Sequence, residues 1–192
     1  MAVLPDVLAR DLDVVFCGTA AGKRSAEVRA YYAGPGNKFW TTMHSIGLTP
    51  RLFAPAEYRE LLNHHIGLTD LAKRVSGADS TLRRQDFGVQ ALRNLITKYQ
   101  PKYIAFTSKR AAREFFGSKV NYGLHPSKLG RTRFFVLPSP SGLASRFWQK
   151  GRHWHELAAL ARPLPPNNRI ERRVNHKVPS SSVGARGAHA ER

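Results

Sequence analysis

An asparagine and two tyrosines stand close together in the segment YYAGPGNKFW, residues 31–40, and their side chains suit a flat polar ligand. A ring such as that of Tyr32 can stack on a planar group, and the amide of Asn37 offers both a hydrogen-bond donor and an acceptor. This combination can bind a nucleobase and read its polar edge. The alternative interpretation places the tyrosines in the core and makes Asn37 a helix cap.

A second segment, VLPSPSGLAS over residues 136–145, reads as a strand that ends in a turn of small hydroxyl residues. Ser139 and Ser141 supply hydroxyl groups there, and Gly142 allows a tight turn. Leu143 follows on the same loop, where a lone apolar side chain can insert into a stack of bases. An ordinary surface turn is the alternative.

Two further segments bear on phosphate binding. Lys109 and Arg110 follow Ser108 at an expected helix start, where free N–H groups and positive charge suit a phosphate; a solvated helix start is the alternative. The segment GTAAGKRS, which begins at Gly18, lacks the spacing of a nucleotide-binding P-loop, because three residues rather than four separate its glycines. Nucleotide hydrolysis is therefore set aside.

Strands and helices alternate along the chain, which predicts a three-layer α/β/α sandwich with a short, mostly parallel central sheet. Ligands in such sheets bind beyond the carboxyl ends of the strands, where all the segments above are expected to lie. The expected strands are 14–17, stopped by Gly18, and 66–72, 102–108 and 133–139. The expected helices are 38–47, 55–65, 85–99, 109–117 and a last one ending at Ala161, with a loop over 23–36.

The composition indicates a polyanionic partner. The net charge of the 192 residues is +18, and the cations are spread along the chain rather than gathered on one amphipathic segment, which favours nucleic acid over a membrane surface. The single cysteine, Cys17, excludes an intrachain disulfide and is expected to be buried. No apolar run long enough to span a bilayer and no secretory signal is visible, so a cytoplasmic, nucleoid-associated protein is expected.

The chain divides near residue 162. Residues 1–162 are expected to form one domain, and residues 163–192 form a basic tail rich in Pro and Ser with few apolar side chains. Such a tail cannot bury enough surface to offset its chain entropy, so it is expected to be disordered. It acts either as an arm that binds DNA or as a solubilising segment.

The segments VVFCG, YYAGPGNKFW, GLTDLA and LPSPSGLAS occur here in the order found in the uracil-DNA glycosylase superfamily, which the chain resembles from about Asp13 to Ala161. It looks most similar to the mismatch-specific uracil/thymine branch, with hypoxanthine-DNA glycosylases as relatives. The resemblance implies a monofunctional enzyme that flips uracil out of DNA and hydrolyses its N-glycosidic bond, leaving an abasic site. It implies no metal or redox cofactor, and a monomer is expected.

The first motif departs from the family pattern. The family carries a water-positioning Asp or Asn at the position of Ala20, and a methyl group cannot hold water. Three outcomes remain open: Asn37 takes over, Asp70 in GLTDLA holds the water, or the protein binds damaged DNA without cutting it. A preference for hypoxanthine is a further alternative.

The resemblance also assigns binding roles. Backbone groups of Gly18, Thr19 and Ala20 would border the base, Tyr32 would stack on it, and Ser139 would donate a hydrogen bond to it. Toward DNA it implies a wedge at Leu143, a turn at Ser141 and Gly142, and phosphate or opposite-strand contacts, which are expected from Lys109, Arg110 and Arg146.

Overall fold

A five-stranded sheet forms the centre of the computed structural model, which describes residues 1–144 and 151–162. The strands lie in the order β2-β1-β3-β5-β4, and neighbours are parallel except for the antiparallel pair of β4 and β5. Their bounds are Val14–Ala21 for β1, Ile66–Ser76 for β2, Tyr103–Phe106 for β3, Gly123–Leu129 for β4 and Thr132–Val136 for β5.

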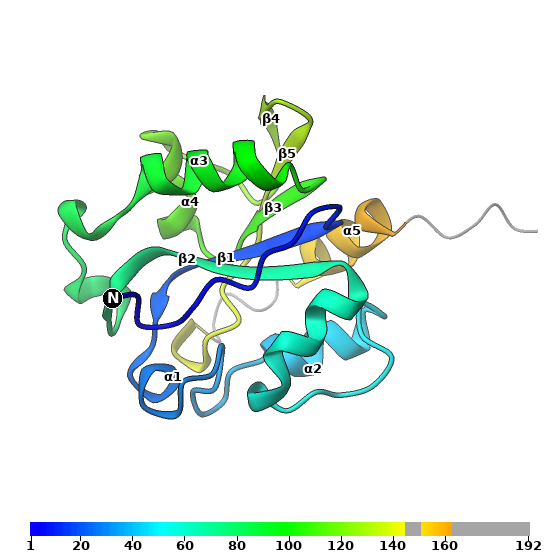
Figure 1. Ribbon diagram of the computed structural model, residues 1–192, viewed down its shortest axis with the longest axis horizontal. Helices are drawn as coiled ribbons and strands as arrows, with labels where there is room; N and C mark the ends of the chain where they lie inside the picture. Colours follow the sequence, from blue (N-terminus) through cyan, green and yellow to red (C-terminus); the bar gives the residue numbers. More distant parts are fainter. Residues whose placement is uncertain (145–150, 163–192) are drawn as a thin grey trace, which may run out of the picture.

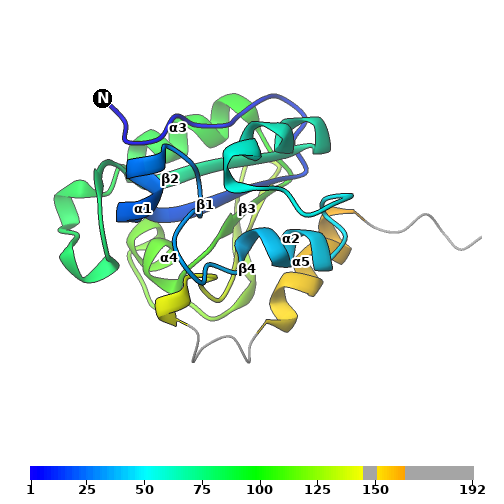
Figure 2. The same ribbon diagram turned by 90° about the horizontal axis from the view of Figure 1, so that it is seen from below.

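Helices cover both faces of the sheet, which confirms the expected three-layer sandwich (Figures 1 and 2). The side chains of β1 alternate between two buried clusters, because successive residues of a strand point to opposite faces. Phe16 packs with Phe39 and Trp154 on one face, and Cys17 belongs to the cluster on the other. The first face is covered by α2 (Phe39–Ser45) and α5 (Arg152–Ala161), and the second by α3 (Val89–Tyr99) and α4 (Lys109–Phe116).

The topology places a ligand site at the carboxyl end of β1. This strand has β2 on one side and β3 on the other, and the chain reaches them over opposite faces of the sheet. Ligands of open α/β sheets bind where the connections diverge in this way, beyond the carboxyl ends of the strands. Residues 18–21 therefore lie where the fold favours a site.

The expectation that Gly18 stops the first strand is wrong. β1 continues to Ala21, because Gly18 pairs with Asp70 and Ala20 with Ala72 in the parallel ladder with β2. The ladder with β3 covers only Val14–Cys17, so beyond Cys17 the described strand is paired on one side. The motif GTAAG thus lies on a strand as far as Ala21, and Gly22 is the N-cap of the helix that follows.

The expected loop over residues 23–36 is also corrected, because α1 occupies Lys23–Val28. This helix has no side-chain cap and is only six residues long, so its own sequence gives a weak helix signal. Packing stabilises it instead: Ser25 is buried, and its hydroxyl accepts a hydrogen bond from the Ala33 N–H at 3.0 Å. Arg29 ends the helix in the left-handed region, with φ of 54°.

Other elements are present with shifted bounds. The segment after Pro55 forms a 3-10 helix, Pro55–His64, in place of the expected α-helix. Single 3-10 turns at Asp79–Thr81 and Arg84–Asp86 precede α3, which begins four residues later than expected. The antiparallel edge strand β4 is not expected from the sequence, because HPSK in its middle breaks the apolar pattern; a register irregularity lies between His125 and Lys128.

The structure also bears on the remaining expectations from the sequence. Cys17 is buried, as expected. Within residues 1–144 and 151–162, no helix is long and apolar enough to cross a membrane. The basic tail and Arg146 lie outside the described residues.

Candidate active site

Asp70 lies on the edge strand β2, on the face of the sheet covered by α2 and α5. It is directly opposite Gly18 in the parallel register, and only 6% of the residue is exposed. A Cβ atom at Gly18 would overlap Oδ1 of Asp70 and lie 3.6 Å from the Tyr32 hydroxyl oxygen. The glycine therefore leaves the space that the carboxylate occupies.

The environment of Asp70 favours its protonated form more than water does. Burial raises its pKa to about 7, opposed by the charge of Lys73 and assisted by that of Asp6. Lys73 itself pairs with Asp6 and bonds to Thr69. No described residue donates a hydrogen bond to the Asp70 carboxylate. A carboxylate with these properties can exchange a proton near neutral pH.

Tyr32 forms the wall beside this carboxylate. Its backbone lies in the left-handed region, with φ of 54°, and its ring stacks on Phe39 with centroids 3.9 Å apart. Its hydroxyl oxygen lies 3.3 Å from Oγ1 of Thr107, the residue that follows β3. Thr107 is a site residue that the sequence analysis missed, although its position after a strand is the signal that points to it.

The opposite face of the same strand ends carries a second polar group. The Oγ1 of Thr19 lies 2.8 Å from Oγ of Ser108 and 3.3 Å from Oδ2 of Asp79. Ser108 is the N-cap of α4, and its hydroxyl accepts a hydrogen bond from the Ala111 N–H at 3.0 Å. Thr19 therefore links β1 to the start of α4, beyond the point where β1 and β3 cease to pair.

The Ser108→Ala variant is expected to lower the free energy of unfolding by about 1 kcal/mol, because it removes an N-cap. Urea unfolding followed by circular dichroism measures the change. An unchanged midpoint would contradict the capping role of this hydroxyl.

The expectation that Asn37 caps a helix is off by one residue, because the N-cap of α2 is Lys38, which makes no side-chain capping bond. The Oδ1 of Asn37 accepts a hydrogen bond from the Phe39 N–H at 2.9 Å, while no described residue accepts one from its amide nitrogen. Asn37 and Tyr32 border one cavity of about 470 Å³, so these two side chains do share a hollow. Gly18, Asp70 and Ser139 do not border that cavity, which is also lined by Trp40 and by residues 52–55 and 57.

A tight turn follows β5 and packs against the loop before α2. The Ser141 N–H donates to Oγ of Ser139 at 3.3 Å, and the Ala144 N–H donates to the Ser141 carbonyl at 2.9 Å. A Cβ at Gly142 would lie 2.9 Å from the Pro35 carbonyl oxygen, so glycine permits the two loops to touch. Leu143 projects from this turn with 91% of its surface exposed.

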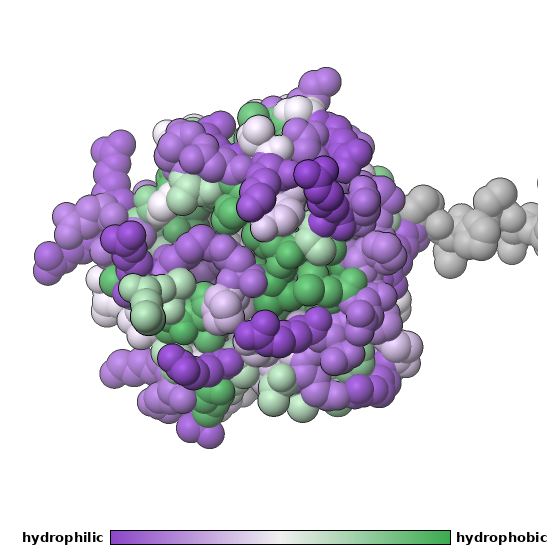
Figure 3. Space-filling view, viewed as in Figure 1, coloured by the Kyte–Doolittle hydropathy of each residue, from purple (hydrophilic) through white to green (hydrophobic). Residues whose placement is uncertain are grey.

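The cations expected to bind phosphate are already engaged. The Nζ of Lys109 lies 4.4 Å from the centroid of the Tyr122 ring. The Nε of Arg110 lies 2.9 Å from Glu114, and its guanidinium lies over Phe87. Both side chains remain on the carboxyl side of the sheet, at the start of α4. Figure 3 shows hydrophilic side chains around an apolar area near the middle of one face.

The structure thus brings together Gly18, Asp70, Tyr32 and Thr107 in one group, and Thr19 with Ser108 in another. Among the described residues of the first group, only Tyr32 borders the same cavity as Asn37. Ala20 contributes no polar side chain to either group. In the described ranges no cluster of three His, Cys, Asp or Glu residues could hold a metal ion.

Comparisons with known proteins agree with this geometry. The family model of the uracil DNA glycosylase superfamily matches residues 5–162. A solution NMR structure of a candidate uracil DNA glycosylase from Methanosarcina acetivorans is similar, with a TM-score of 0.55 and 25% sequence identity. That match covers 83% of this chain and 97% of the other.

Proposed function

Because this chain belongs to the uracil DNA glycosylase superfamily, we propose that it removes uracil from DNA by hydrolysing the N-glycosidic bond of an everted nucleotide. Membership of the superfamily supports DNA glycosylase chemistry, and the choice of uracil as the excised base is the more specific part of the proposal. The observation that carries the proposal is the buried carboxylate of Asp70, which accepts no hydrogen bond from the part of the chain that the structure describes and lies beside the carboxyl end of β1.

Asp70 is the proposed holder of the attacking water. As the bond from C1′ to the base nitrogen breaks, its electron pair leaves with the base and C1′ becomes cationic. The ionised carboxylate stabilises that cation, orients the water toward C1′ and takes the proton that the water releases. This role replaces the polar side chain that Ala20 cannot supply.

Asn37 is the less suitable of the two candidates for holding water. Its carbonyl oxygen already accepts the Phe39 N–H, and the amide nitrogen that remains can donate but cannot accept a proton. We therefore place Asn37 as a donor toward the bound strand. Tyr32 would stack on the base, while the Ser139 hydroxyl and backbone groups of Gly18, Thr19 and Ala20 would contact its polar edge.

The exposed leucine on the turn after β5 supports a wedge. An apolar side chain that is 91% exposed has no packing role, and it stands on a turn fixed by Ser141 and Gly142. Leu143 would fill the gap left in the duplex by the everted base. Lys109 and Arg110 are the proposed phosphate contacts, together with Arg146.

The Leu143→Ala variant is expected to slow uracil release from duplex DNA by about tenfold or more, because a wedge offsets a few kcal/mol of unstacking. Release from single-stranded DNA should change little, since no stack has to be opened there. Single-turnover assays on the two substrates measure the difference, and an equal loss on both would contradict the wedge.

The overall proposal is tested with oligonucleotides that carry uracil, hypoxanthine or mismatched thymine, paired and unpaired. We expect alkali-labile abasic product from uracil. Release of hypoxanthine alone would change the base but keep the chemistry. Salt-sensitive binding without any product would instead favour a non-catalytic DNA-binding module, an alternative that rests on Ala20, Ser139 and the charge of +18.

A further inference from the structure

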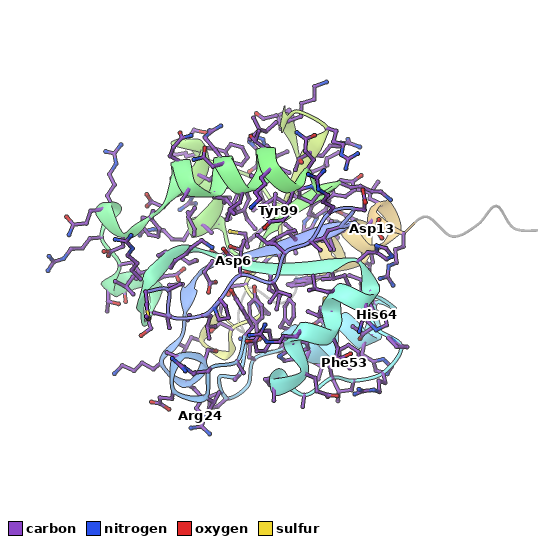
Figure 4. The ribbon with its side chains drawn as sticks, viewed as in Figure 1. Asp6, Asp13, Arg24, Phe53, His64 and Tyr99 are labelled. Atoms are coloured by element: carbon purple, nitrogen blue, oxygen red, sulfur yellow. The ribbon has the colours of Figure 1, made fainter. Side chains whose placement is uncertain are left out.

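The cavity beside Tyr32 is not used by the chemistry proposed for Asp70. Its aromatic walls are Tyr32, Trp40 and Phe53, and Leu52 adds an aliphatic side chain that is 52% exposed. Figure 4 shows Phe53 near His64 at the lower right of the molecule, away from Arg24 at the lower left. With a volume of about 470 Å³, the cavity has room for a nucleobase.

The position of the cavity separates it from the bond that breaks. Hydrolysis requires the glycosidic bond near Asp70, and neither Asp70 nor Gly18 borders the cavity. Tyr32 belongs to both places, because its hydroxyl reaches Thr107 at the strand ends while the residue also lines the cavity. Because Tyr32 borders both the cavity and the site at Asp70, consecutive nucleotides of one strand can reach the two.

The lining selects an uncharged flat group. The exposed Leu52 and the half-buried Tyr32 offer apolar contact, since Trp40 and Phe53 are only 5% and 4% exposed. The amide nitrogen of Asn37 is a donor without a described acceptor. Glu57 also borders the cavity, and hydrogen bonds from Arg51 and from the Ala54 N–H lower its pKa to about 2. This carboxylate stays ionised at neutral pH and repels a phosphate, whereas an uncharged base can pack against Leu52 and Tyr32.

We propose that this cavity is a subsite for the nucleobase next to the excised base on the same strand. The assignment rests on the proposed function for the place of the excised base. The phosphate between the two nucleotides would lie outside the cavity, and the flanking base would enter it.

Binding of a short fluorescein-labelled single strand with a central 2′-fluoro-deoxyuridine, which resists cleavage, tests the subsite. One neighbour at a time is replaced by a tetrahydrofuran spacer that has no base. We expect one of the two spacers to weaken binding to the wild-type chain by about fivefold or more, from the loss of the contact between that base and the side chains of Leu52 and Tyr32. The measurement is fluorescence anisotropy.

Leu52→Ala and Thr41→Phe alter exposed side chains that line the cavity, so neither is expected to unfold the protein. The same spacer should weaken binding to both variants by less than about twofold, because the contact is already lost. Leu124→Ala is the matched control: Leu124 is 42% exposed on β4, does not border the cavity, and should leave the spacer effect as in the wild type.

Three outcomes would overturn the subsite. They are wild-type binding that is insensitive to both spacers, variants as sensitive as the wild type, and sensitivity at the central base alone, which would place the excised base in the cavity. Failure of the proposed function is detected separately, as absence of uracil release from the cleavable oligonucleotide of the same sequence.

Discussion

Asp70→Asn is expected to slow uracil release by about 10²–10⁴-fold at pH 8, because an amide cannot take a proton from the attacking water. The wild-type rate should rise with pH and level off above about 7, where burial places the pKa of Asp70. The variant should lose this dependence. Single-turnover release between pH 5 and 9 measures both effects.

The matched control for this variant is Asp79→Asn. Asp79 stands at the same end of the sheet but bonds to Thr19 on the opposite face, away from Tyr32. It should leave both the rate and the pH profile close to those of the wild type. A wild-type pH profile retained in Asp70→Asn would show that another group holds the water.

Asp70→Asn should also make the fold more stable at alkaline pH. The pKa of Asp70 rises from an ordinary value near 3.8 to about 7 in the folded chain, so the folded state binds this proton more tightly than the unfolded state. Stability therefore falls as the pH rises between these values, by an amount on the order of 4 kcal/mol once the group is ionised. Urea unfolding should show Asp70→Asn above the wild type at pH 8 and close to it at pH 4.

The layers of the fold were predictable because apolar residues recur in the sequence at the spacings typical of strands and helices. Phe134 to Val136 reads as a strand, and the helix over Lys109–Phe116 ends at Gly117 as predicted, with φ of 69°. Elements held mainly by tertiary contacts were not predictable. The helix α1 depends on the hydrogen bond from Ala33 to Ser25, and β4 depends on pairing with β5.

The candidate site was predictable in its residue types more than in its arrangement. Asp70 follows an apolar run and could be selected as a replacement for the missing side chain at Ala20. That Gly18 faces it depends on the register of β1 against β2, which the sequence does not encode locally. The same holds for Asn37, which accepts a hydrogen bond from the Phe39 N–H and borders a cavity that is also lined by residues 52–55.

Gly18→Ala is expected to reduce release by about 10²-fold, since a shift of about 1 Å in a reacting group is enough for such a loss. The added methyl would occupy the place of the Asp70 carboxylate and press toward the Tyr32 hydroxyl. Because both neighbours are packed, the same change should lower the free energy of unfolding by about 1–3 kcal/mol. Release assays and urea unfolding measure the two effects.

Gly22→Ala provides the matched control, because nothing lies within 4 Å of a Cβ added at that glycine. It should keep the wild-type rate. In an Asp70→Ala background, Gly18→Ala should add little further loss of either activity or stability, since the group that the methyl displaces is already gone. A full additional loss in that background would mean that Gly18 acts through its own backbone contacts with the substrate rather than through the carboxylate.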